Sequence, residues 1–344
     1  MHRSGTSAMA RVLGLCGATL PRHTMAAHES NALGHWEPQR VVDTHDAFLA
    51  DAGTAWDEAR DYPDTIFASP AAVACRRKLA DIVRDEYGNT PLFVLKDPRT
   101  SRLMPLWRPV LTALGAMPHV VIMVRNPLEV AGSLKQRNGW SDARGLTIWL
   151  RYLLRAERDT RDLPRCFVSY DQLISDWPAA VAKLSSQLDI QFLERDAATD
   201  REIDRFVRRG LRHHQRNEKE LLRRADVPDC VKQAYLCVSA AVETGIVDYA
   251  AMDAVAAALD SAEHALEEVR QTARATESDL GSPAKRDALL ALALAEFDRV
   301  RGKVERSERM LRDMRTSWSW RLTRPFRAVG RAVARLRGGL KPAS

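Results

Sequence analysis

The 344-residue chain has no long apolar run and no cysteine pattern typical of disulfide-rich or zinc-binding proteins. Its apolar stretches all fall short of the ~18 residues that a membrane-spanning helix needs. Its first residues show no basic stretch followed by an apolar core, so a secretory signal is not indicated. The five cysteines are scattered and never spaced as CxxC. We therefore expect a cytoplasmic protein with free cysteines and no bound metal.

Acidic residues are missing from residues 316–344, which hold seven of the 52 Lys and Arg residues. The rest of the chain therefore has 45 basic and 45 acidic residues and is formally neutral. We expect no specific nucleic-acid partner. Apolar residues recur in this segment at spacings of three and four, and SWSW stands at its start. The pattern predicts a basic amphipathic helix on an anionic membrane surface, which would hold the protein at the inner face of the membrane. A disordered basic tail is the alternative.

Three short apolar runs predict buried parallel strands, and helical patterns separate and flank them. The runs are residues 92–95 (LFVL), 120–124 (VVIMV) and 166–170 (CFVSY). Helices are expected over residues 9–16, after Pro127, over residues 144–161 and over residues 181–188. Alternating strands and helices predict a three-layer α/β domain with a parallel sheet, which we assign to residues 1–225.

After about residue 200 the strand signals stop, and a heptad pattern follows. Apolar residues over 252–269 alternate at spacings of three and four, and the same alternation returns over 290–314. Gly281 and Pro283 would break one long rod, which favours an antiparallel helical hairpin or coiled coil within residues 226–315. The alternatives are parallel pairing of two chains into a homodimer and packing of both helices on the main domain.

The stretch MHRSGTS at residues 1–7 combines the residue types that hold oxyanions in loops before helices. Gly5 permits close approach of the backbone to an anion, and Ser4, Thr6 and Ser7 can donate hydroxyl hydrogen bonds. The helix that follows directs its positive end at the loop, and Arg3 adds a charged fork for phosphate or sulfate oxygens. The loop lacks the GxxxxGK[ST] pattern of a Walker A motif. On its own it also fits an ordinary helix cap.

A second candidate anion contact follows the run at residues 120–124, which leads directly into Arg125. An Arg at the carboxyl end of a parallel strand faces the crevice in which such sheets bind ligands. Ser133 comes eight residues later, within the next helix, where it can return to the same anion. The two loops together are a stronger signal than either alone.

The loop at residues 1–7, followed along the chain by the segment with Arg125 and Ser133, resembles motifs of the PAPS-dependent sulfotransferase family. The donor of this family is 3'-phosphoadenosine 5'-phosphosulfate (PAPS). RSGTS resembles the family's 5'-phosphosulfate loop, and Arg125 with Ser133 matches the spacing of its 3'-phosphate motif. The resemblance spans about residues 1–220 and implies a P-loop-like fold. Supporting segments, similar to those of bacterial members or protein-tyrosine sulfotransferases, are NALGHWE (31–37), LKDPRTSRLMPLW (95–107), VSYDQLISD (168–176) and LRHH (211–214).

The resemblance implies transfer of a sulfuryl group from PAPS to a hydroxyl or amine of an acceptor such as a bacterial glycan. Arg3 and Lys96 are the implied catalytic residues that neutralise charge on the leaving phosphate. As in phosphoryl transfer, such catalysis depends mainly on positioning and charge stabilisation. The implied donor-binding residues are Arg3, Ser4, Gly5, Thr6, Ser7, Arg125, Ser133 and, in a late loop, Arg212.

Sulfuryl transfer also needs a base that takes the acceptor proton, and family members use His or Glu. Glu37 is our choice because it ends the Trp-Glu segment after the first helix. His28, Glu29 and His35 are its rivals. The plain alternatives are that Glu37 is a solvated loop carboxylate and that Lys96 is a surface lysine.

The chain departs from the family pattern at its first residues. In relatives a central strand precedes the anion-binding loop, whereas here only Met1 and His2 do. We expect either a start upstream of Met1 or a truncated relative, and a chain of low stability or weak activity because the sheet is incomplete. Upstream in-frame codons for an apolar strand would favour a misassigned start, and a stop codon there would exclude it.

Two other functions fit parts of the sequence. A P-loop nucleotide kinase-like enzyme shares the fold class, although the missing Walker A Lys disfavours it. A coiled-coil or membrane-surface scaffold would use the heptads and the basic helix, with a domain that is catalytically weak or inactive. The motifs do not identify the acceptor of a sulfotransferase, because acceptor pockets lie in variable loops.

Overall fold

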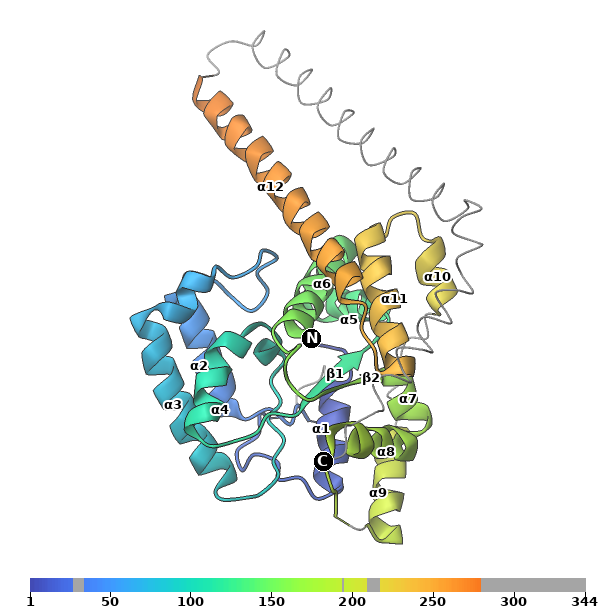
Figure 1. Cartoon of the computed structure of the whole chain (residues 1–344). Helices are drawn as coiled ribbons and strands as arrows, with labels where there is room; N and C mark the ends of the chain where they lie inside the picture. The colour runs from blue at the N-terminus through green and yellow to red at the C-terminus, as the bar shows by residue number, and fades with distance from the viewer. Residues whose placement is uncertain (27–33, 194, 209–216, 280–344) are drawn as a thin grey trace, which may run out of the picture. The chain divides into compact units, whose positions relative to one another are not determined.

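The computed structural model of the protein describes residues 1–26, 34–193, 195–208 and 217–279. Two strands, β1 (Val120–Val124) and β2 (Arg165–Ser169), stand among many helices (Figure 1). The helices are α1 (Thr6–Leu15), α2 (Gln39–Asp51), α3 (Pro70–Tyr87), α4 (Met104–Ala113), α5 (Pro127–Asn138), α6 (Asp142–Arg158), α7 (Tyr170–Ser175), α8 (Trp177–Leu188), α9 (Ala197–Arg208), α10 (Glu218–Arg223), α11 (Asp229–Thr244) and α12 (Tyr249–Asp279), with short 3₁₀ turns over Asp64–Ala68 and Pro98–Arg102.

The four helices predicted from the sequence are confirmed as α1, α5, α6 and α8. Local chemistry sets their ends. The side chain of Asn126 caps α5 by accepting a hydrogen bond from Leu128 N at 3.0 Å, and Pro127 takes the first helical position. Gly139, at φ 70°, ends the same helix in the left-handed conformation that suits glycine.

The two strands form a parallel pair. Val120 lies opposite Arg165, and Val124 lies opposite Ser169. The bounds of β1 match the predicted run at residues 120–124. Strand β2 begins and ends one residue earlier than the predicted run at residues 166–170. A parallel pair joined through α5 and α6 puts the protein in the mixed α/β class, although helix dominates.

The strand predicted at residues 92–95 is wrong as a strand. Phe93 forms one isolated parallel bridge with Thr19, through hydrogen bonds from Thr19 N to Leu92 O and from Val94 N to Thr19 O, both 2.9 Å. A cavity of about 890 Å³ is lined by this segment and also by β1. Both segments line this cavity, and residues 92–95 form no ladder with β1. The run was also expected to be buried, whereas its four residues are only half-buried.

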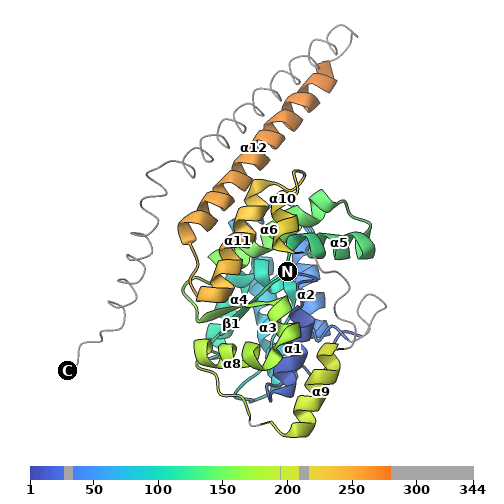
Figure 2. The same ribbon diagram turned by 90° about the vertical axis from the view of Figure 1, so that its right-hand side faces the viewer.

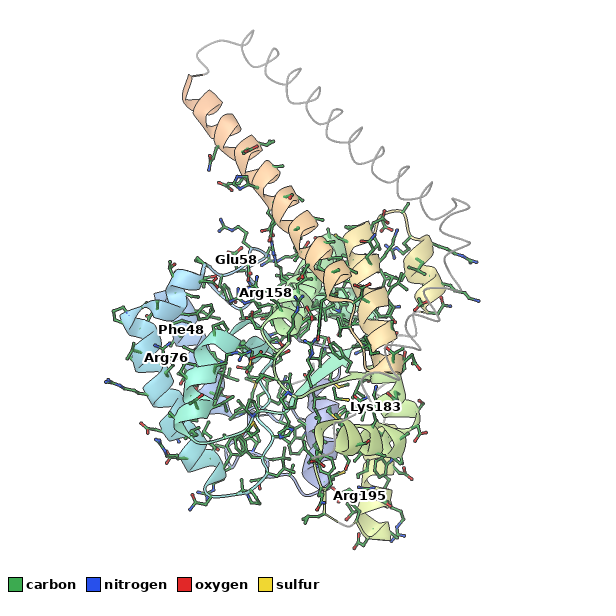
Figure 3. All side chains as sticks on the ribbon, in the orientation of Figure 1. Phe48, Glu58, Arg76, Arg158, Lys183 and Arg195 are labelled. Atoms are coloured by element: carbon green, nitrogen blue, oxygen red, sulfur yellow. The ribbon has the colours of Figure 1, made fainter. Side chains whose placement is uncertain are left out.

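Helices cover both faces of β1. Ile122 and Val124 belong to one core cluster, in which they pack with residues of α5, α6 and α11. Met123, which points the opposite way, belongs to a second cluster with residues of α1 and α8. Lys183 of α8, labelled in Figure 3, anchors this layer by donating a hydrogen bond to Phe167 O of β2 at 2.7 Å. A strand buried on both faces explains the continuous apolar sequence of β1.

A third core cluster joins α2, α3 and α4, which the sequence patterns did not predict. These helices lie together on one side of the strands (Figures 1 and 2). Trp107 of α4 and Leu79 of α3 are fully buried in this cluster. The cluster positions the segment around Lys96, because Phe93 and Leu95 pack against it.

The first arm of the heptad pattern lies in α12, where Met252 and Val255 are buried in the cluster that contains α11. Arg151 of α6 pairs with Asp260 at 2.8 Å. The first compact unit accordingly runs from Met1 to Glu263, further than the predicted boundary at residue 225. The second heptad arm at 290–314 and the basic segment 316–344 lie outside the described residues. Within the described part of the chain, no helix is both long enough and apolar enough to cross a membrane.

Candidate functional site

The loop at residues 3–7 leads into the N-terminus of α1. Gly5 is the N-cap residue at φ 90°, and no side chain of the described residues caps the helix. The N-terminus of α1, where helices commonly bind anions, therefore faces the loop without a side-chain cap. Ser4 is 1% exposed, and its hydroxyl finds no hydrogen-bond partner among the described residues. A buried hydroxyl without a partner is unfavourable, which suits a ligand that supplies an acceptor oxygen.

Only glycine fits at position 5. A Cβ built there would lie 2.3 Å from Cδ2 of Tyr170, the first residue of α7, and the positive φ adds backbone strain. Ser4, which precedes Gly5, is buried. Arg3 has a positive φ as well, at 63°. The loop is thus held in a sharply bent form against Tyr170.

The second predicted loop meets the first. Arg3 Nε donates a hydrogen bond to Ser133 Oγ at 2.7 Å, across 130 positions of sequence. Arg125 Nη1 donates to Arg3 O at 3.0 Å. Arg125 follows β1 directly, and Ser133 lies inside α5, so the strand and the helix after it deliver both residues to the same loop. The structure therefore brings together Arg3, Arg125 and Ser133, as the two sequence motifs suggest.

Positive charge accumulates on this side of the loop. Burial, followed by the charges of Arg137 and Arg125, lowers the pKa of Arg3. Arg125 Nε pairs with Glu129 at 2.8 Å, and its guanidinium lies 4.2 Å from the centre of the Tyr170 ring. Because nearby positive charge disfavours the charged form of Arg3, an anion bound beside Arg3 would relieve that repulsion.

The opposite side of the loop holds Lys96 and Glu37, both buried. Lys96 Nζ donates to Ser7 Oγ and to His35 O, each at 3.0 Å, and forms a short ion pair with Glu37 Oε1. Burial raises the pKa of Glu37, although the charge of Lys96 opposes the change. Burial lowers the pKa of Lys96, and Glu37 opposes that change in turn. The predicted catalytic pair therefore lies together, with Lys96 touching the loop through Ser7.

Behind Lys96 lies a buried network that the sequence analysis did not identify. His45 Nδ1 and Asp97 Oδ2 are 2.7 Å apart, and Trp107 Nε1 donates to His45 Nε2 at 2.9 Å. Because Nε2 accepts from Trp107, the imidazole proton lies on Nδ1 and is donated to Asp97. Burial opposes ionisation of Asp97, but His45 and the charge of Arg99 hold its pKa below the usual range. The network fixes the backbone that carries Lys96.

The other predicted residues lie at the loop, beside Glu37 or outside the described residues. Thr6 begins α1, in line with its predicted place at the loop. His35 Nδ1 is 3.9 Å from Glu37 Oε1, so this rival base lies beside the favoured one. Arg212, His28 and Glu29 lie outside the described residues. Among the residues that are described, no group of three or more His, Cys, Asp and Glu side chains could hold a metal ion.

Comparison of the chain with protein-family models, with curated proteins and with solved structures finds no match.

Proposed function

We propose that the protein is a PAPS-dependent sulfotransferase built on a P-loop-like α/β domain. The observation that carries the proposal is the hydrogen bond from Arg3 to Ser133, which joins two anion-binding motifs that lie far apart in sequence. A single anion site would fit many ligands. Two such sites that share a loop fit a donor with two separate phosphate groups.

The residues present suit the two ends of this donor. At the 5' end, the amides at the start of α1, the unpartnered Ser4 hydroxyl and the side chain of Lys96 would hold the phosphosulfate. At the 3' end, Arg125 and Ser133 would hold the phosphate that distinguishes PAPS from ATP. Arg3 lies between the two ends and can serve either.

The proposed reaction needs only charge stabilisation and one proton transfer. The bound donor supplies the sulfuryl group. A new bond forms between its sulfur and the acceptor oxygen as the bond from sulfur to the phosphate oxygen breaks. Lys96 and Arg3 would neutralise the negative charge that remains on the phosphate. Glu37 would take the proton of the acceptor hydroxyl, and its raised pKa makes it a stronger base than an ordinary carboxylate.

The ion pair with Lys96 would also make the availability of Glu37 as a base depend on the bound donor. Before the donor binds, each charge compensates the other in a buried setting. A phosphosulfate at the loop would attract Lys96 away from Glu37, because Lys96 already reaches Ser7 of that loop. The carboxylate would then be free to act as a base only when the donor is present.

The acceptor class proposed here is a glycan hydroxyl. The basic segment 316–344 would bring the enzyme to a membrane surface where such glycans are made.

Calorimetric titration with the desulfated product, 3',5'-adenosine bisphosphate (PAP), tests the proposal against its rivals. A sulfotransferase binds PAP without metal and binds ATP with magnesium much more weakly. The reverse order, together with magnesium-dependent ATP turnover, would show a kinase-like enzyme. Absence of binding by both nucleotides would favour a scaffold protein and overturn the proposal.

A further inference from the structure

Arg137 lies one helical turn beyond Ser133 on α5, on the same side of the helix. Ser133 in turn bonds to Arg3 of the loop. The Arg137 guanidinium lies 5.4 Å from the centre of the Trp56 ring. The same ring lies 4.4 Å from that of His2, the residue before Arg3. Two separate sets of contacts therefore put Arg137 beside the anion-binding loop.

Arg137 differs from Arg125 and Arg144 in its partners. Its Nε donates to the neutral amide oxygen of Asn138 at 2.7 Å. No carboxylate of the described residues lies within 4.0 Å of its nitrogens. Arg144, which also lies over a tryptophan, pairs with Asp57 at 2.7 Å. Arg137 therefore has no ion-pair partner among the described residues, whereas Arg125 and Arg144 each pair with a carboxylate.

This charge is held in place and partly shielded from water. Trp56 and Trp140 lie 5.5 Å apart, and Trp56 supports the guanidinium of Arg137 through a cation–π contact. Burial lowers the pKa of Arg137, the charge of Glu37 raises it, and the charge of Arg99 lowers it further. A cation that is already ordered and partly desolvated loses little freedom when an anion binds to it.

The donor does not need this residue. Arg3, Arg125, Ser133 and the start of α1 account for both phosphate ends of the proposed donor. Arg137 instead acts in the electrostatic field of Glu37, the group that must meet the acceptor hydroxyl. A negative group on the acceptor, placed close to the hydroxyl that reacts, is the remaining partner for it.

We propose that Arg137 binds a negatively charged group of the acceptor, so that the acceptor is an anionic glycan bearing a carboxylate, phosphate or sulfate. That the bound molecule is the acceptor follows from the proposed sulfuryl transfer. That Arg137 binds an anion follows from the contacts of Arg137 alone. Charge-assisted pairing by a guanidinium fork would select such a glycan over its neutral counterpart.

The test compares two probe sugars, 4-nitrophenyl β-glucuronide and its neutral twin 4-nitrophenyl β-glucoside, by calorimetry on the full chain. We expect the wild type to prefer the glucuronide by about 10-fold or more, as a hydrogen bond to a charged group predicts. Arg137→Ala should remove the preference, and Arg137→Lys should keep part of it. Arg144→Ala is the matched control and should leave the preference intact.

Parallel titrations with PAP separate the two proposals. A wild type that binds both sugars equally, or binds neither, overturns the assignment of Arg137, and so does a preference that survives Arg137→Ala. If the preference depends on Arg137 but PAP does not bind, the anion site stands and the sulfotransferase proposal fails. With PAPS as the donor, Arg137→Ala should reduce kcat/KM for the glucuronide much more than kcat/KM for the glucoside.

Discussion

On one side of the loop at residues 3–7, Lys96 pairs with the carboxylate of Glu37, whereas on the other side Arg3 bonds to the neutral hydroxyl of Ser133. The first side is electrically balanced within the protein. The second gathers guanidinium groups, and the pKa of Arg3 is lowered there by burial and then by the charges of Arg137 and Arg125. The balanced side suits a proton transfer that is switched on by the ligand. The positive side suits recognition of a phosphate that stays bound throughout the reaction.

The largest expected effect comes from removing the base on the balanced side. Glu37→Gln should reduce kcat by about 10²–10⁴, the usual contribution of a general base. PAP affinity should not change, because the positive side is untouched. Rates measured across pH sharpen the assignment. The base must be deprotonated, so wild-type activity should fall as pH drops through the raised pKa of Glu37, and this limb should vanish in Glu37→Gln. Near-normal activity of the variant would remove Glu37 from the mechanism.

Removal of the cation on the same side should affect both turnover and folding. Lys96→Met should reduce kcat by about 10²–10³ and lower the free energy of unfolding by roughly 3–5 kcal/mol, because it leaves Glu37 charged and buried. The double variant Lys96→Met/Glu37→Gln should recover most of the stability but none of the activity. Urea unfolding of Lys96→Met, Glu37→Gln and the double variant measures these differences in the free energy of unfolding. Equal stability of the single and double variants would contradict a buried ion pair.

On the positive side, Arg125→Ala should weaken PAP binding by about 10–100-fold, the range for a lost charge-assisted hydrogen bond. Ser133→Ala should weaken it less, since a neutral hydroxyl is lost. Lys135→Ala is the control, because Lys135 is exposed on α5 and pairs with Asp142 at 3.4 Å. Thermal shift with PAP reports the differences. A control variant that weakens PAP as strongly as Arg125→Ala would point to nonspecific electrostatics.

The smallest expected effect concerns the shape of the loop. Gly5→Ala should destabilise the protein by about 1–2 kcal/mol through its left-handed backbone, and it should also press on Tyr170. Gly132→Ala is a suitable control because it lies in α5, where an added Cβ meets nothing within 4 Å. Both variants can be compared by thermal unfolding and PAP titration. Equal behaviour of the two would mean that the loop adapts without penalty.

Periodicity was sufficient to predict α1, α6 and α8, each of which buries one face, whereas Pro127 marked the start of α5 and a continuous apolar run indicated β1. The strand expected at residues 92–95 failed because this apolar run is only half-buried and forms a single bridge, between Phe93 and Thr19. The α2–α4 cluster was missed although Trp107 and Leu79 are fully buried in it. Helices α2 and α3 mix apolar residues with many charged ones, and α4 is short and contains two prolines.

The motif residues were easier to predict than their surroundings. The loop and the Arg125–Ser133 pair come from short local patterns, and the fold needs only one strand and one helix to bring them together. His45 and Asp97 could not be found in the same way, because their contact joins α2 to a distant segment. Arg137 carried a usable signal, since its place one turn after Ser133 puts it on the same helix face.

The affinity for PAP relative to AMP tests the central claim most directly, because the two nucleotides differ only in the 3'-phosphate assigned to Arg125 and Ser133. Both titrations use the wild-type chain under identical conditions of salt and pH. We predict that PAP binds at least about 10-fold more tightly than AMP, as one charge-assisted contact requires. Equal affinities, or a preference for AMP, would contradict the joint anion site around Arg3.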